Sequence, residues 1–144
     1  MIIAPLIAGI VGTFAMTLFL MLPRWLHRGK VDVIGAVGAL ITGKTEGAAG
    51  IGFAIHFLSG IVFAYVYYFS IKLSGFPLNW GIFTLAGAIH GVIAMLLVAI
   101  VIMEHHPIAR FHDRGPMTGI MQLVAHIVYG AVTGLVIEFI GVAK

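Results

Sequence analysis

The stretch MTGIMQLVAHIVYGAVTGLVIEFIGV, residues 117–142, decides the fold class of this chain. A bilayer core of about 30 Å needs roughly 20 apolar residues in helical conformation, and this stretch meets that length. Its side chains do not alternate between polar and apolar, as those of a membrane β-strand would. The stretch therefore predicts a transmembrane α-helix.

Further upstream, other segments have the same length and apolar character, and Gly and Pro residues separate them. The sequence therefore predicts one all-α domain over residues 1–144, a four-helix transmembrane bundle. The predicted spans are residues 2–22, 50–71, 80–103 and 117–142.

Composition supports the same conclusion, because 61% of the 144 residues are hydrophobic and only 9% are charged. Soluble domains carry about 25% charged residues, so lipid is the solvent that suits this chain. Cysteine is absent, which excludes disulfides and thiol chemistry. The net charge of +3 comes from a few residues that flank the spans, so no nucleic-acid partner is expected.

The distribution of Lys and Arg predicts the direction of the spans. Six lie in the first and third loops, namely Arg24, Arg28, Lys30, Lys44, Arg110 and Arg114, whereas only Lys72 and Lys144 lie on the opposite side. The positive-inside rule then places both loops in the cytoplasm and both termini outside, in a cell (inner) membrane. An aromatic belt is expected at the outer surface, formed by Tyr65, Tyr67, Tyr68, Phe76 and Trp80.

The two halves of the chain share a pattern. Spans one and three both contain Ala-Gly followed by Gly-x-x-Ala-Met, at residues 8–16 and 86–95, and spans two and four both contain His-x-x-x-Gly. These matches predict two parallel-repeat helix pairs related by an axis along the membrane normal, with chance similarity among Gly-rich spans as the alternative. The extra stretch in loop one, residues 31–42, predicts a short interfacial helix with Asp32 as its N-cap.

Three short motifs carry a resemblance over most of the chain. They are Ala-Gly-x-x-Gly-Thr-x-x-Met at residues 8–16, His-Phe-Leu-x-Gly at 56–60 and His-x-x-Tyr-Gly-x-x-x-Gly at 126–134. With these motifs the chain resembles a family of small four-span bacterial membrane proteins of unknown function. The resemblance implies the four-span topology and brings no activity with it.

Small residues at helical spacing indicate where helices pack. Gly87 and Gly91 form one such pair, and Gly130 and Gly134 form another. Lipid supplies no hydrophobic drive for helix association, so small residues that let backbones approach stabilise it. The partner helices belong either to this chain or to another subunit, and we expect a homo-oligomer or a larger membrane complex.

Intramembrane histidines are the first candidate site, because ionisable groups inside a membrane are functional candidates by default. His56 and His126 lie at similar depth, as a bis-histidine haem or another tetrapyrrole would require, and His90 lies deeper. Hydrogen bonding to neighbouring helices is the structural alternative. A polar pathway along His90, His126 and Glu138 is a third interpretation.

The third loop is the second candidate site, because its residue types can bind a transition metal. A turn at Pro107 could bring them together, and His27 of the first loop could join them. The predicted metal ligands are Glu104, His105, His106, His112 and Asp113.

Three functional hypotheses follow. The first is a non-catalytic membrane subunit or scaffold that packs into a larger complex. The second is a small transporter or channel, and the third is a redox protein that holds haem or another tetrapyrrole through His56 and His126. No zincin, phosphate-loop or nucleophile-elbow motif occurs, so an enzyme that acts alone is not expected.

Overall fold

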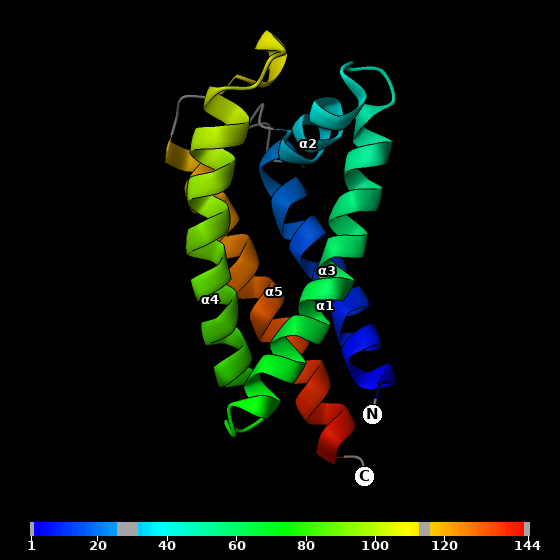
Figure 1. Ribbon diagram of the computed structural model, residues 1–144, viewed down its shortest axis with the longest axis vertical. Helices are drawn as coiled ribbons and strands as arrows, with labels where there is room; N and C mark the ends of the chain where they lie inside the picture. Colours follow the sequence, from blue (N-terminus) through cyan, green and yellow to red (C-terminus); the bar gives the residue numbers. More distant parts are fainter. Residues whose placement is uncertain (1, 26–31, 113–115, 143–144) are drawn as a thin grey trace.

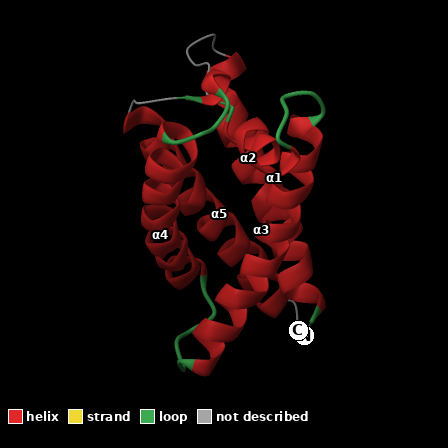
Figure 2. Ribbon diagram, turned by 45° about the horizontal axis from the view of Figure 1, so that its top comes forward, coloured by secondary structure: helices red, strands yellow, loops and turns green. Residues whose placement is uncertain are grey.

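The computed structural model describes residues 2–25, 32–112 and 116–142, and these are almost entirely helical (Figure 1). Figure 2 shows that the only other structure in the described part of the chain is short loops and turns. The elements are α1 (Ile3–Trp25), α2 (Val33–Thr42), α3 (Ala48–Leu73), α4 (Trp80–Leu96), the π-helical segment η1 (Leu97–Glu104), the 3-10 turn η2 (Ala109–Phe111) and α5 (Pro116–Val142). The predicted all-α class is confirmed.

Three helices are by themselves long and apolar enough to cross a membrane, over Ile3–Leu22, Ala48–Leu73 and Pro116–Gly141. These correspond to the predicted spans one, two and four. The third predicted span differs, because α4 has only 17 residues before the backbone changes from α-helix to the eight-residue π-helix η1 at Leu97. The α-helical part of this segment, α4, is therefore too short by itself to count as a membrane span.

Local capping explains where the two shorter helices begin. Asp32 Oδ1 accepts a hydrogen bond from the Gly35 amide at 2.8 Å, and Asn79 Oδ1 accepts one from Ile82 at 3.0 Å. Gly43 and Gly47 both have positive φ, 69° and 71°, so they allow the tight turn between α2 and α3. The short helix predicted in loop one is thus present as α2, with the predicted N-cap.

Helix α2 packs backbone against backbone on α3. A Cβ atom added at Gly38 would clash with the backbone of Ala48, and one added at Gly52 would clash with the carbonyl of Ile34. The glycines are needed because no side chain fits between the two helices. The predicted position of α2 at a membrane interface stays a prediction, but its place against α3 is clear.

The predicted small-residue faces of spans three and four meet each other. A Cβ at Gly130 would lie 3.0 Å from the Cα of Gly87, and a Cβ at Gly87 would lie 3.0 Å from the Cα of Gly130. In the same way, a Cβ at Gly9 of α1 would lie 2.9 Å from the Cα of Ile61 on α3. These faces therefore hold this chain's own helices together.

Helix α5 packs against both α1 and α4, and α1 packs against α3, but α3 and α4 have few contacts with each other. Figures 1 and 2 show these two helices diverging from their short connection toward the end that carries α2. A parallel repeat would pair α4 with α3 as α1 pairs with α5. The two halves therefore do not pack equivalently, and α3 and α4 are left apart.

Two tyrosines of the predicted aromatic belt lie elsewhere. Tyr67 and Tyr68 are only 6% and 4% exposed, and both belong to the apolar core, together with Phe83 and Tyr129. Their aromatic type suggested an interfacial role, but Tyr67 packs against Phe83 of α4 and Tyr129 of α5. Phe76 and Trp80 are exposed, as expected of belt residues.

Candidate functional site

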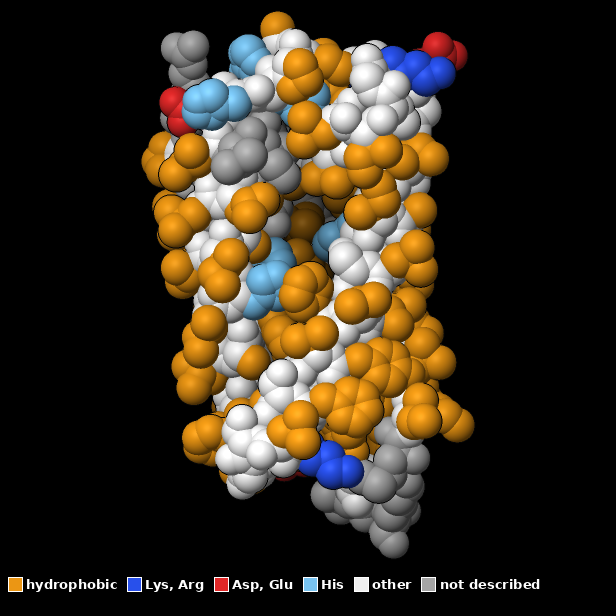
Figure 3. All heavy atoms as spheres, viewed as in Figure 1, with side chains coloured by type: hydrophobic (Ala, Val, Ile, Leu, Met, Phe, Trp, Pro, Cys, Tyr) orange, Lys and Arg blue, Asp and Glu red, His pale blue; other side chains and the backbone are white. Residues whose placement is uncertain are grey.

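A pocket of about 360 Å³ lies in the space that α3 and α4 leave between them. Figure 3 shows a hollow there, with histidine side chains along it in an otherwise apolar surface. Most of its walls are apolar side chains from α1, α2, α3, α4 and η1, while α5 contributes polar ones. The polar residues that line it are Thr13, His56, Ser59, His90, Gln122, His126 and Tyr129.

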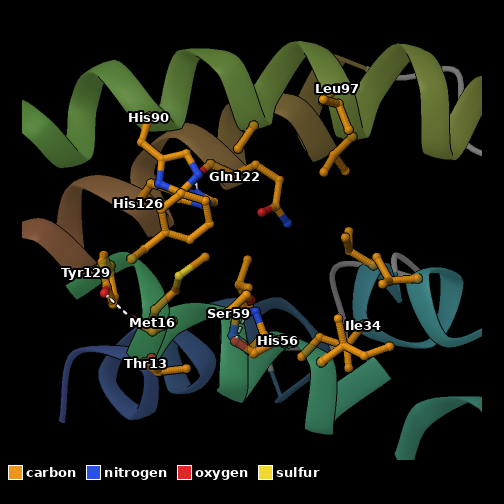
Figure 4. A pocket seen from close by; sticks show the side chains of 18 of the residues that line it. Thr13, Met16, Ile34, His56, Ser59, His90, Leu97, Gln122, His126 and Tyr129 are labelled. Atoms are coloured by element: carbon orange, nitrogen blue, oxygen red, sulfur yellow. Dashed lines mark hydrogen bonds between the residues drawn. The ribbon is translucent and has the colours of Figure 1, made fainter. Parts of the chain in front are cut away.

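The polar groups reach the pocket from four different helices, and Thr13 stands on α1. His56 and Ser59 stand on α3, His90 on α4, and Gln122 and His126 one turn apart on α5. Figure 4 shows His56 on the opposite side of the pocket from His90 and Gln122. The three intramembrane histidines predicted as a site therefore line one cavity.

His90 and His126 are in direct contact, with ring centroids 4.6 Å apart in an edge-on arrangement. Phe63 packs on His90 with its ring centroid 4.1 Å away. The hydroxyl of Tyr67 lies 2.9 Å from Nδ1 of His90, so this buried tyrosine holds the ring in place. The sequence interpretation missed Tyr67 because it was assigned to the outer belt.

Hydrogen bonding decides which nitrogen of His126 is available. Its Nδ1 lies 2.7 Å from the backbone carbonyl of Gln122, and a carbonyl can only accept, so Nδ1 carries the proton. In the neutral imidazole, Nε2 is then a bare acceptor. No described residue hydrogen-bonds this Nε2, and His126 lines the pocket.

The same reasoning gives the tautomer of His56. The hydroxyl of Thr17 donates to the carbonyl of Thr13 at 2.7 Å, so its only proton is used. His56 Nε2, 3.1 Å from Thr17 Oγ1, must therefore be the donor in that contact. Thr17 of α1 thus orients His56 of α3. This contact is the hydrogen bond to a neighbouring helix that was the structural alternative for the histidines.

Gln122 is the least expected member of the pocket. The residue is only 4% exposed, and its Nε2 is buried without a hydrogen-bond partner among the described residues. Figure 4 shows its side-chain amide extending into the pocket. A buried, unpaired donor costs about 1–3 kcal/mol, so this amide is a candidate to hydrogen-bond a bound molecule or water in the pocket. No sequence motif had identified it as a site residue.

The third-loop candidates do not converge on one point. His106 is 1% exposed, and both its ring nitrogens are used, because Nδ1 accepts from the Ile108 amide and Nε2 donates to the carbonyl of Ala36. His112 Nε2 bonds the carbonyl of His106, and His105 Nδ1 lies 2.7 Å from the carbonyl of Ile100. His106 therefore fixes the third loop to α2.

Among the residues that the structure describes, no three His, Asp or Glu side chains lie close enough to hold one metal ion. Glu104 is exposed at the end of η1. The remaining predicted ligand Asp113, and His27, lie outside the described residues. The predicted metal set is thus not assembled by the described part of the chain.

Glu138 is separate from the pocket. Its Oε2 accepts a hydrogen bond from the backbone amide of Trp80 at 2.9 Å, at the start of α4. A carboxylate there satisfies one of the free amides at a helix N-terminus and favours its positive end. Of the pathway predicted along three residues, His90 and His126 meet, whereas Glu138 caps a helix.

Replacing Glu138 with alanine is expected to lower the free energy of unfolding by about 1 kcal/mol, the usual cost of a lost helix cap. Glu138→Gln keeps an acceptor and should lose less. Unfolding by denaturing detergent, measured by circular dichroism, distinguishes the two variants. Equal losses for both would mean that the charge, and not the hydrogen bond, stabilises this end of α4.

Together, the described residues form an all-helical bundle with an apolar, histidine-lined pocket and three helices long enough to cross a membrane. The chain belongs to a family of unknown function, DUF6789, whose model matches residues 1–143. This confirms the expected relation to a family without an established activity. The chain has no match among curated proteins and none among solved structures.

Proposed function

We propose that this chain is an integral membrane protein that binds a small apolar molecule taken from the bilayer into the pocket between α3 and α4. The observation that carries the proposal is the pocket itself. Its volume of about 360 Å³ falls in the range of small-molecule sites, and its walls are mostly apolar with a few converging polar groups.

The proposal requires that the pocket face lipid. Helices α1, α3 and α5 meet the length for a membrane span, and η1 extends α4 past the roughly 20 residues needed. With four spans, the divergence of α3 and α4 opens the pocket sideways into the acyl chains. Large apolar side chains are exposed on both helices that flank the opening, among them Leu58, Ile89 and Ile93.

The charges support the direction inferred from the sequence. Lys44 and Arg110 lie in the connections at the α2 end of the bundle, and Lys72 lies at the opposite end of α3. The positive-inside rule then puts α2 and the third loop on the cytoplasmic side. In this orientation the pocket opens in the membrane, nearer the cytoplasmic face.

The sequence-based hypotheses compare as follows. The subunit or scaffold hypothesis stays a prediction, and a ligand pocket is compatible with it. A channel along His90, His126 and Glu138 is less favoured, because Glu138 bonds α4 outside the pocket. A haem held between His56 and His126 is also less favoured, because His56 Nε2 donates to Thr17 while only His126 presents a bare Nε2.

Filling the pocket should abolish binding. Ala94 lines the pocket on α4, and Ala94→Phe places a ring in it. The matched control is Ala54→Phe, which makes the same change at an exposed position of α3 outside the pocket. In nanodiscs, a diazirine-bearing terpene hydrocarbon should crosslink pocket residues such as Met16 in the wild type and in Ala54→Phe.

In Ala94→Phe we expect crosslinking of the pocket to fall at least tenfold, which corresponds to about 1.4 kcal/mol. Crosslinking of exposed residues such as Leu85 and Phe139 should stay unchanged in all three proteins, because these residues do not line the pocket. Mapping by mass spectrometry measures both. Pocket residues that are never labelled, or are labelled equally in both variants, would contradict the proposed function.

A further inference from the structure

The polar groups of the pocket specify the chemistry of the molecule that it takes. No Lys, Arg, Asp or Glu lines the pocket among the described residues. A charged headgroup would therefore enter an apolar site without a counter-ion, at a cost of several kcal/mol. The pocket thus selects against fatty acids and phosphate-bearing lipids and favours an uncharged ligand.

Two of the polar groups, one a donor and the other an acceptor, can both hydrogen-bond the same oxygen atom of a ligand. Gln122 offers an unpaired N–H donor, and His126 offers an unpaired Nε2 acceptor. They stand four residues apart on α5, where Cβ atoms lie about 5–6 Å apart, so one oxygen between them can reach both. The terminal torsion of Gln122 is soft, so the amide can turn toward that oxygen.

From this pairing we infer that the ligand carries an uncharged hydroxyl group, which accepts from Gln122 Nε2 and donates to His126 Nε2. A ketone or ether oxygen accepts but cannot donate, so it leaves the His126 nitrogen unpaired. A hydrocarbon leaves both groups unpaired. Among these groups, the hydroxyl alone satisfies the donor and the acceptor at once, and an apolar body then fills the rest of the pocket.

The hydroxyl side chains that line the pocket already donate to backbone carbonyls, and Thr13 donates to Gly9. Ser59 Oγ donates to the carbonyl of His56 at 2.9 Å, and Tyr129 donates to the carbonyl of Gly60. Nδ1 of His90 faces the hydroxyl of Tyr67. The second nitrogen of His56 has no hydrogen-bond partner among the described residues, but His56 lies across the pocket from Gln122 (Figure 4). Gln122 and His126 stand one turn apart on α5, so they form the hydroxyl-recognising pair.

This inference rests on the proposed function, and one competition experiment separates the two. In nanodiscs, farnesol, its methyl ether, farnesene and farnesoic acid each compete with the diazirine-bearing terpene hydrocarbon for the pocket. We expect farnesol to compete at about tenfold lower concentration than the ether or the hydrocarbon, and the acid to be the weakest. A short-tailed hydroquinone and its quinone form a second pair, which compares a phenolic hydroxyl with a carbonyl oxygen. Comparing the hydroquinone with farnesol then distinguishes a phenolic hydroxyl from an alcohol.

The variant Gln122→Leu removes the donor and replaces the amide with a branched apolar side chain that is one atom shorter. The hydroxyl of farnesol then keeps only its bond to His126, so the preference for farnesol over farnesene should fall, while farnesene itself competes as before. The preference for farnesol over the ether depends on His126 and should remain. Because the substitution also removes a buried unpaired amide, the unliganded variant should be at least as stable as the wild type. The matched control is Ser59→Ala, which deletes a hydroxyl that is already paired and should keep the preference.

The outcomes differ for the two proposals. If the hydrocarbon labels the pocket but alcohol, ether and hydrocarbon compete equally, or if Gln122→Leu keeps the full preference for farnesol over farnesene, the hydroxyl inference is wrong and the apolar pocket remains. If the hydrocarbon does not label the pocket at all, the proposed function itself is wrong. Preference for the acid would contradict the assignment of an uncharged ligand.

Discussion

Replacing Gly130 with alanine is expected to lower the free energy of unfolding by about 1–3 kcal/mol, the usual cost of overpacking. The added methyl group would meet the carbonyl of Phe83 and would lie 3.0 Å from the Cα of Gly87. Both are backbone atoms, which cannot rotate away as a side chain can. The only relief is to move α4 away from α5, and this loosens the most extensive helix contact in the chain.

The control is Gly50→Ala on α3, where an added Cβ has no atom within 4 Å. Alanine is the better helix former, so this variant should be as stable as the wild type or slightly more so. Unfolding in mixed micelles, followed by circular dichroism, measures both. If the two variants lose the same stability, the close approach of Gly87 and Gly130 does not hold α4 and α5 together.

The second large effect is expected at His106. His106→Ala should lower the free energy of unfolding by about 2–4 kcal/mol, because it opens a cavity and leaves the Ile108 amide without its acceptor. It also removes the hydrogen bond to the carbonyl of Ala36, which joins the third loop to α2. Heating in detergent with a near-ultraviolet probe of packing measures the loss.

The adjacent residue supplies the control. His105 is exposed, so His105→Ala should change stability by no more than about 0.5 kcal/mol. A metal role for this loop would give a different pattern. Zinc would then stabilise the wild type, a chelator would reverse the effect, and both substitutions would abolish it. That result would contradict a purely structural role for His106.

Much of the fold could be predicted from the sequence. Long apolar stretches predict helices because every backbone polar group in an apolar solvent must be paired locally. The Asp32 cap and the short helix after it were predictable for the same local reason. What the pattern could not predict was the length of α4, because the change to π-helix at Leu97 has no signal in an all-apolar run.

The site was predicted in part. His56, His90 and His126 were identified because histidine is rare in apolar helices, and they do line one pocket. Gln122 was not identified as a site residue. It is a candidate because its buried amide has no partner among the described residues, and only the packing of the helices decides that. Tyr67 was misplaced because an aromatic residue near a helix end fits both an interface and a core.

By itself, then, the sequence determined that the chain is helical and apolar, with stretches long enough to cross a membrane, since these properties follow from composition and from local hydrogen bonding. Only the tertiary structure decided which helices stay apart. Glycine lets α5 approach α4 closely, while α2 packs on α3 and the two halves pack unequally. The unequal packing of the two halves leaves the space between α3 and α4, and the three histidines and Gln122 line that space. No residue pattern within one helix could have predicted this pocket.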